Sequence, residues 1–219
     1  MAPPYQRGVD DPQPGACSDI ATITVPSGRT FGIHAHLLAH YSDYFLRALN
    51  GNSEKAKTQN FDMSLYATEA TLDMFVGWIY AKSTAIYHKI FDSMNIDTLG
   101  YDNSPDDLVE AWLFGEHIEP PEFKDTVLML IYRYAQVEGF DNTYPWAFGA
   151  WDRIPAKSRL RPFLVDLLCE QLGECSQIGL IDAVDILPDD IALEIFKRLI
   201  HGQAFLFGKV RFELEEYLL

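Results

Sequence analysis

Residues 18–51 read SDIATITVPSGRTFGIHAHLLAHYSDYFLRALNG, and their hydrophobic period changes once, near Ala35. Ser18–Val25 alternates with period two and is rich in β-branched residues, which is typical of a strand. The segment Pro26-Ser27-Gly28 is a turn signal, and the alternation resumes over Thr30–His34. The first half of this stretch therefore predicts a β-hairpin.

From Ala35 onward the apolar residues recur at helical spacing, and they are Leu37, Leu38, Tyr41, Tyr44, Phe45, Ala48 and Leu49. Ser42 is expected to divide this run into two helices, because a serine oxygen can accept hydrogen bonds from the amides of the next turn. Gly51 ends the second helix, and residues 50–59 read as a polar connection. We therefore expect a helical pair directly after the hairpin.

The middle of the chain predicts a short third strand at 60–63 and a helix at 68–80 with Leu72, Phe75, Val76 and Ile79 on its inner face. Residues 81–102 read as loop-rich, with a short strand considered at 85–87. Ser104 and Pro105 are a helix start signal, and Pro120-Pro121 opens the next helix. Phe123, Val127, Leu130, Ile131 and Tyr134 share the expected inner face of that helix.

The last third of the chain predicts further helices. A short helix at 145–153 carries Trp146 and Trp151, and Ser158 begins another that ends at Gly173. Pro188-Asp189 starts a last helix, with Ile191, Ile195 and Leu199 inward and Gly202 at its end. The tail, 205–219, fits neither period clearly.

Composition limits the function classes. The chain has 219 residues, of which 48% are hydrophobic and 13% aromatic, enough for a packed core. Its formal net charge is −15, from 17 Lys and Arg against 32 Asp and Glu, and so acidic a surface repels phosphate groups. We therefore expect no nucleic-acid or membrane partner.

The expected compartment is the cytoplasm or nucleus. The first 16 residues lack the apolar segment of a signal peptide, and no apolar run approaches the roughly 20 residues that span a bilayer. The three cysteines, Cys17, Cys169 and Cys175, have no paired spacing and fit a reducing environment.

The chain resembles the BTB/POZ family over about residues 18–135. The opening matches are Ser18-Asp19-Ile20, Gly28, Phe31-Gly32-Ile33-His34, Leu37-Leu38, Ser42-Asp43-Tyr44-Phe45 and Ala48-Leu49-Asn50-Gly51. Later, Phe75 with Trp78-Ile79-Tyr80 is similar to a helix end of the family, and residues 108–123 to its following helix pair. A weaker likeness at 145–172 is to the stretch that follows the BTB unit in fungal-type members.

The resemblance implies an α+β protein with the BTB/POZ fold, a short β-sheet flanked by α-helical hairpins, followed by an all-helical extension. We expect a flexible leader at 1–17, the BTB/POZ domain at 18–138 and the helical extension at 139–219. The implied function is a non-enzymatic protein–protein interaction module of unknown partner, with homodimer formation as one mode. The alternative is a substrate adapter for a cullin-type ubiquitin ligase. No cofactor or small-molecule substrate is implied.

The resemblance points to Asp19 and His34 as candidates for protein contacts. In the family, an acid at the position of Asp19 lies near the dimer groove and can pair with a basic residue after the motif histidine, but here that residue is Ala35. The alternative is that Asp19 only caps or solvates the start of the strand. In the family the histidine is also a structural residue at the strand–helix junction.

Ser53 and Lys55 are the other two candidates. Family members that recruit a cullin carry a hydrophobic-x-Glu element after the helical pair, and an ungapped reading places Ser53-Glu54-Lys55 there. Serine offers little apolar surface and lysine inverts the charge, so this element argues against cullin binding. Residues 1–17 are too Pro-rich for the helix that swaps between family dimers, which leaves a smaller symmetric interface.

Signals for chemistry are weak. His36 and His40 share a helix face at i, i+4 beside His34, but a zinc site needs further ligands, and no Glu follows the first histidine as a metalloprotease would need. Cys169 lies within an apolar helical pattern, and no activating cation adjoins Cys175. We therefore expect neither a metal site nor an enzyme.

Overall fold

The computed structural model describes residues 19–82, 104–138, 146, 149–174, 187–201 and 217–218. Over these residues the protein is mixed α+β and mostly helical, with one three-stranded sheet, as the sequence predicts at this coarser level. The chain divides into two compact units, Met1–Val127 and Leu128–Leu219, which are described separately. The leader, the strand considered at 85–87, the break at 139–144, Cys17, Cys175 and Gly202 lie outside the described residues.

The predicted hairpin is confirmed. Strands β1 (Ile20–Thr24) and β2 (Thr30–His34) pair antiparallel, with Ile20 opposite His34. In the turn, the Gly28 amide donates to the Val25 carbonyl at 2.9 Å, and Gly28 has φ +83°, a region that favours glycine. Residues 21, 23 and 25 are buried, so the alternation in the sequence is the inward-facing pattern of β1.

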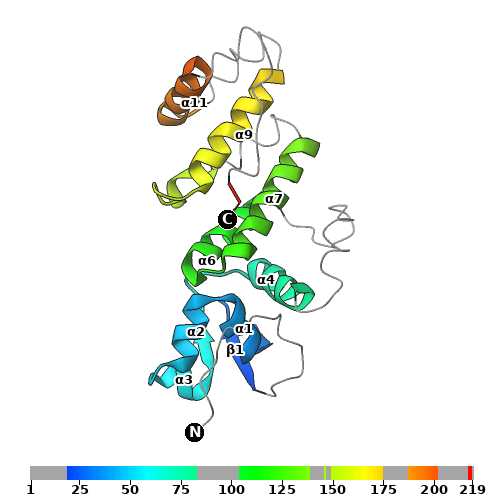
Figure 1. Cartoon of the computed structure of the whole chain (residues 1–219), viewed down its shortest axis with the longest axis vertical. Coiled ribbons are helices and arrows are strands. Elements are labelled where there is room, and N and C mark those ends of the chain that lie inside the picture. Colours follow the sequence, from blue (N-terminus) through cyan, green and yellow to red (C-terminus); the bar gives the residue numbers. More distant parts are fainter. Residues whose placement is uncertain are drawn as a thin grey trace. The chain divides into compact units, whose positions relative to one another are not determined.

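The predicted third strand, β3 (Asn60–Asp62), pairs parallel to the other side of β1 and gives the sheet order β2-β1-β3. A parallel neighbour needs a crossover, and here the helical pair supplies it. These helices, α1 (Ala35–Tyr41) and α2 (Asp43–Asn50), lie side by side next to the sheet (Figure 1). As predicted, Ser42 separates them, and its Oγ accepts the Phe45 amide at 3.2 Å.

The polar connection predicted at 50–59 contains a short helix, α3 (Glu54–Thr58), which the sequence reading missed. The Ser53 Oγ caps it by accepting the Ala56 amide at 3.3 Å, and Gln59 ends it in the left-handed region. None of its five residues is buried, so no apolar periodicity marks it. A single helical turn that is held by its caps leaves no hydrophobic periodicity in the sequence.

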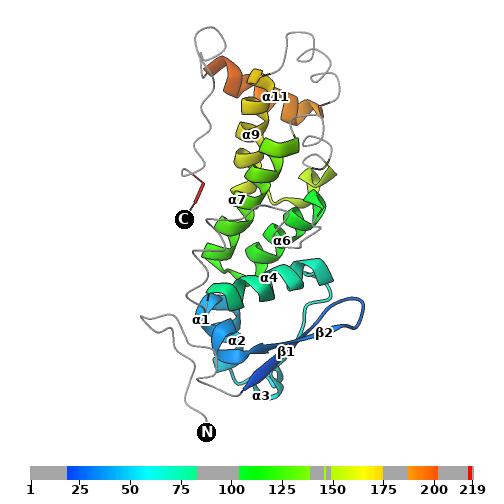
Figure 2. The same cartoon turned by 90° about the vertical axis from the view of Figure 1, so that its right-hand side faces the viewer.

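Three longer helices complete the core of unit 1: α4 (Glu69–Lys82), α6 (Pro105–Ile118) and the start of α7 (Pro121–Glu138), which continues into unit 2. All three were predicted, and Ser104 with Asp107 forms a capping box at the start of α6. In Figure 2, α4 lies between the sheet layer and α6.

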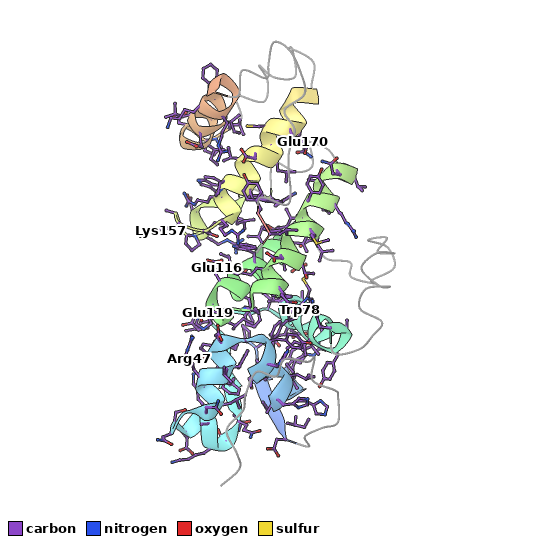
Figure 3. The ribbon with its side chains drawn as sticks, in the orientation of Figure 1. Arg47, Trp78, Glu116, Glu119, Lys157 and Glu170 are labelled. Carbon is purple, nitrogen blue, oxygen red and sulfur yellow. The ribbon has the colours of Figure 1, made fainter. Side chains whose placement is uncertain are left out.

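An aromatic cluster joins these helices. The ring of Phe75 on α4 lies 5.4 Å from that of Phe114 on α6 and 5.2 Å from that of Phe123 on α7. Trp78 (Figure 3) donates its indole N–H to Thr126 Oγ1 at 3.1 Å. The core of unit 1 therefore consists of residues drawn from the whole length of its sequence.

Unit 2 contains the rest of α7, a 3-10 turn η2 (Trp151–Arg153), α9 (Leu160–Glu174) and α11 (Asp189–His201). Leu130 and Tyr134, predicted inward on α7, are half-buried, while Leu128, Ile131 and Ala135 are buried instead. Within the predicted helix at 145–153, Trp146 and Gly149 are helical and η2 follows. The predicted domain boundary at residue 138 stays a prediction.

Helices α9 and α11 pack together (Figure 1). Ser158, the predicted cap, lies two residues before α9, and its Oγ accepts the Leu160 amide at 3.3 Å. Asp166 on α9 joins three parts of the unit, because it pairs with Arg198 of α11 at 3.0 Å and with the hydroxyl of Tyr217. Arg159 holds the same tail segment by donating to the carbonyls of Tyr217 and Leu218.

Candidate protein-interaction surface

Asp19 and His34 lie at the same end of the β1–β2 ladder, on neighbouring strands. Asp19 is exposed directly before β1, and its main-chain carbonyl accepts the amide of Ala35 at 3.0 Å. The Ala35 side chain is fully buried, so this position offers no cation to pair with Asp19. His34 Nδ1 lies 2.7 Å from the hydroxyl of Tyr80, which ties the strand–helix junction to α4.

Ser53 and Lys55 lie together on the exposed surface of α3. The Ser53 hydroxyl is engaged with the Ala56 amide, and the Lys55 carbonyl accepts the Gln59 amide that ends the helix. The structure therefore places these two candidates on one surface turn, and Gln59, which ends that turn, accepts the Thr22 amide of β1 at 2.8 Å.

A third surface feature lies in the turn after β3, which the sequence reading missed. The amides of Tyr66 and Ala67 both donate to the Met63 carbonyl, at 2.9 and 3.0 Å, and close a tight turn. Met63 and Ala67 are buried and anchor it. The turn projects Leu65 outward at 88% exposure, with Tyr66 beside it at 46%.

Rings from three separate segments meet at this turn. Tyr66 stacks on His117 near the end of α6, with ring centroids 3.6 Å apart and planes 7° apart. Tyr44 of α2 contacts the same imidazole at 5.1 Å. We call the set Tyr44, Leu65, Tyr66 and His117 the aromatic patch.

Charged groups border the aromatic patch. Arg47 of α2 pairs with Glu119 after α6 at 3.0 Å, and Figure 3 shows the two labelled side by side. Partial burial lowers the pKa of His117, and the positive charge of Lys55 lowers it further, while Glu119 acts in the opposite direction. Lys55, a candidate from the sequence, therefore acts electrostatically on the patch.

Histidine and cysteine side chains are the other groups that could carry chemistry. Among the described residues no group of three or more His, Cys, Asp or Glu side chains could hold a metal ion. The His36 ring contacts the His34 ring at 5.6 Å, and the His40 ring contacts that of Tyr41 at 4.6 Å. Burial raises the pKa of the Cys169 thiol to about 12, so it is protonated and unreactive at neutral pH.

No protein-family model matches the chain. No curated protein matches it either. Within the described residues, no helix combines the length and apolar character that crossing a bilayer requires.

The aromatic patch could be found from the sequence only in part. Leu65 and Tyr66 are apolar residues in a short turn segment between a strand and a helix, which is a weak signal of exposure. Tyr44, Tyr66 and His117 are separated by up to 73 residues, from 44 to 117, and only the fold brings their rings together.

Proposed function

We propose that this chain is a non-enzymatic protein–protein interaction module of the BTB/POZ type. One observation carries the proposal: the residues that resemble the family motifs are also the residues that join separate elements in this fold. His34 bonds to Tyr80, and the hydroxyl of Ser42 donates to the main-chain carbonyl of Ile118. A chance likeness in sequence would not be expected to fall on these contacts.

The element order supports the same proposal. An antiparallel hairpin, a helical pair and a third strand follow one another in the order that the hydrophobic pattern predicts, over the same residues that carry the family motifs. The aromatic patch gives this module a surface on which another protein could bind. An exposed tyrosine beside an exposed leucine forms an apolar surface site, and tyrosine together with the bordering Arg47 supplies two of the residue types that are enriched at binding hot spots.

The experiment compares variants of the full chain in a capture assay. Leu65→Lys replaces an 88% exposed side chain, and Val137→Lys, at a residue 74% exposed on α7, is the matched control. A protein enriched by the wild type would be purified and titrated against all three forms. We expect Leu65→Lys to weaken binding at least tenfold and Val137→Lys to leave it unchanged. Equal affinities for all three would contradict the patch as the docking surface.

The second candidate function is a cullin adapter, and the position of α3 favours testing it. Ser53 and Lys55 are exposed, and Lys55 acts on His117 of the aromatic patch. The double variant Ser53→Phe, Lys55→Glu restores the hydrophobic and acidic side chains of the family element. A purified cullin N-terminal domain should bind the variant more tightly than the wild type. If neither form binds at 100 μM or so, the adapter function is wrong.

A further inference from the structure

Helix α11 has apolar residues on two opposite sides. Ile191 and Ile195 are buried in unit 2. Leu193 and Phe196 are 55% and 57% exposed, three residues apart, and therefore lie on one outer face. Two large apolar side chains side by side on a helix surface indicate a contact that the described part of the unit does not supply.

The outer face has the spacing of a helix-pairing seam. Leu193 and Phe196 are three residues apart, the spacing of adjacent inward positions in a coiled coil, and Asp189 lies four residues before Leu193 on the same face. Lys197 lies next to this seam with its side chain 56% exposed, and its ion pair with Glu194 is 3.6 Å long. An exposed pair of this kind contributes little, so Lys197 can exchange it for another carboxylate.

Charge determines which occupant fits. The chain carries a net charge of −15, so two copies repel each other over most of their surfaces. Along the outer face of α11, an acid stands at the start, Asp189, and a base two turns later, Lys197. An antiparallel second copy that packs Leu193 on Phe196 brings each Asp189 within about one turn of the partner's Lys197. A parallel copy would place like charges together.

We propose that α11 pairs antiparallel with α11 of a second copy and forms a two-fold symmetric homodimer. The contact is isologous, because each helix offers the same seam and the same acid–base pair to the other. The dimer contact involves residues of unit 2 only, whereas the aromatic patch belongs to unit 1. The two proposals can therefore be tested independently. A seam this short falls below the size of a standard interface, and we expect a dissociation constant of roughly 10–300 μM.

The first test measures self-association of the full chain by sedimentation velocity from about 1 to 500 μM. We expect a concentration-dependent dimer that Phe196→Lys weakens at least tenfold. The control variants Val137→Lys and Leu65→Lys, also at exposed apolar residues, should leave dimerisation unchanged. Leu65→Lys separates the two proposals, since it tests the aromatic patch without touching α11.

The second test uses the charge pair and gives an effect that a general loss of stability cannot imitate. Asp189→Lys and Lys197→Glu should each reduce homodimer formation. In either variant residues 189 and 197 carry the same charge, and the two-fold symmetry brings this repelling pair together at two places in the dimer. Mixed in equal amounts, the two variants should form a heterodimer, because both contacts then join opposite charges. Monomeric wild type at 500 μM or so, unchanged dimerisation of Phe196→Lys, or a mixture that associates no better than its components would each overturn the proposal.

Discussion

Replacing Ser42 with alanine should lower the free energy of unfolding more than any other serine cap in the described part of unit 1. The Ser42 hydroxyl is fully buried and makes two hydrogen bonds: it accepts the Phe45 amide that begins α2 and donates to the Ile118 carbonyl that ends α6. One oxygen atom therefore bonds to the start of α2 and to the end of α6, through residues 76 positions apart in the sequence.

The magnitude follows from these two bonds. Loss of a helix N-cap costs about 1 kcal/mol. The Ile118 carbonyl would remain buried without its donor, which costs about 1–3 kcal/mol more. We expect Ser42→Ala to lower the free energy of unfolding by about 2–4 kcal/mol in total. For a chain of this size, that corresponds to a fall of roughly 5–15 °C in the melting temperature.

Ser53→Ala is the matched control. Ser53 also caps a helix by accepting the amide three residues ahead, but it is exposed and its α3 is one turn long. We expect it to cost about 0.5 kcal/mol. Urea denaturation measures the free energy of unfolding of both variants. Hydrogen exchange of peptides from α2 and α6 then shows whether the loss of stability lies in unit 1. If Ser42→Ala were no more destabilising than Ser53→Ala, the buried second bond would not contribute as argued.

Three further predictions concern charge. Lys55→Glu should raise the pKa of His117, because a repelling cation becomes an attracting carboxylate, whereas Lys57→Glu should have a smaller effect; an NMR titration of the imidazole measures both. Because the pKa of Cys169 is raised from 9.0 to about 12, its contribution to stability is present below pH 9 and is lost between pH 9 and 12, and the native thiol should resist alkylation at pH 8 while the unfolded thiol reacts. Asp166→Ala should speed hydrogen exchange in α11 more than Arg198→Ala does, since Asp166 also holds Tyr217, and equal effects would contradict that role.

Local signals in the sequence predicted most of unit 1. Period-two alternation located β1 and β2, and the caps Ser42 and Ser104 located helix starts, because both depend on residues within one turn of each other. On α4, Leu72, Phe75 and Ile79 are buried as predicted, but Trp78 is buried and Val76 only half-buried. The helix packs against both α6 and α1 and is joined to β2 through Tyr80 and His34, so its buried face is wider than one stripe.

The sequence could not predict the parts that depend on distant partners. The parallel register of β3 beside β1 involves only three residues, which is too short a run for a period. The aromatic patch requires α2, the turn after β3 and the end of α6 to be in place before its rings meet. Of the four predicted contact residues, only Lys55 is coupled to that patch. The family membership, the partner and the domain boundary remain predictions.

Two helices in the described part of the chain end on residues that are not glycine but adopt a left-handed backbone: Gln59 after α3, with φ 54°, and Glu119 after α6, with φ 55°. This conformation costs an ordinary residue about 1 kcal/mol. At Glu119 the ion pair between its side chain and Arg47 offsets part of this cost. The molecule thus stores energy at both helix ends, and its native state is less stable than the same architecture would permit.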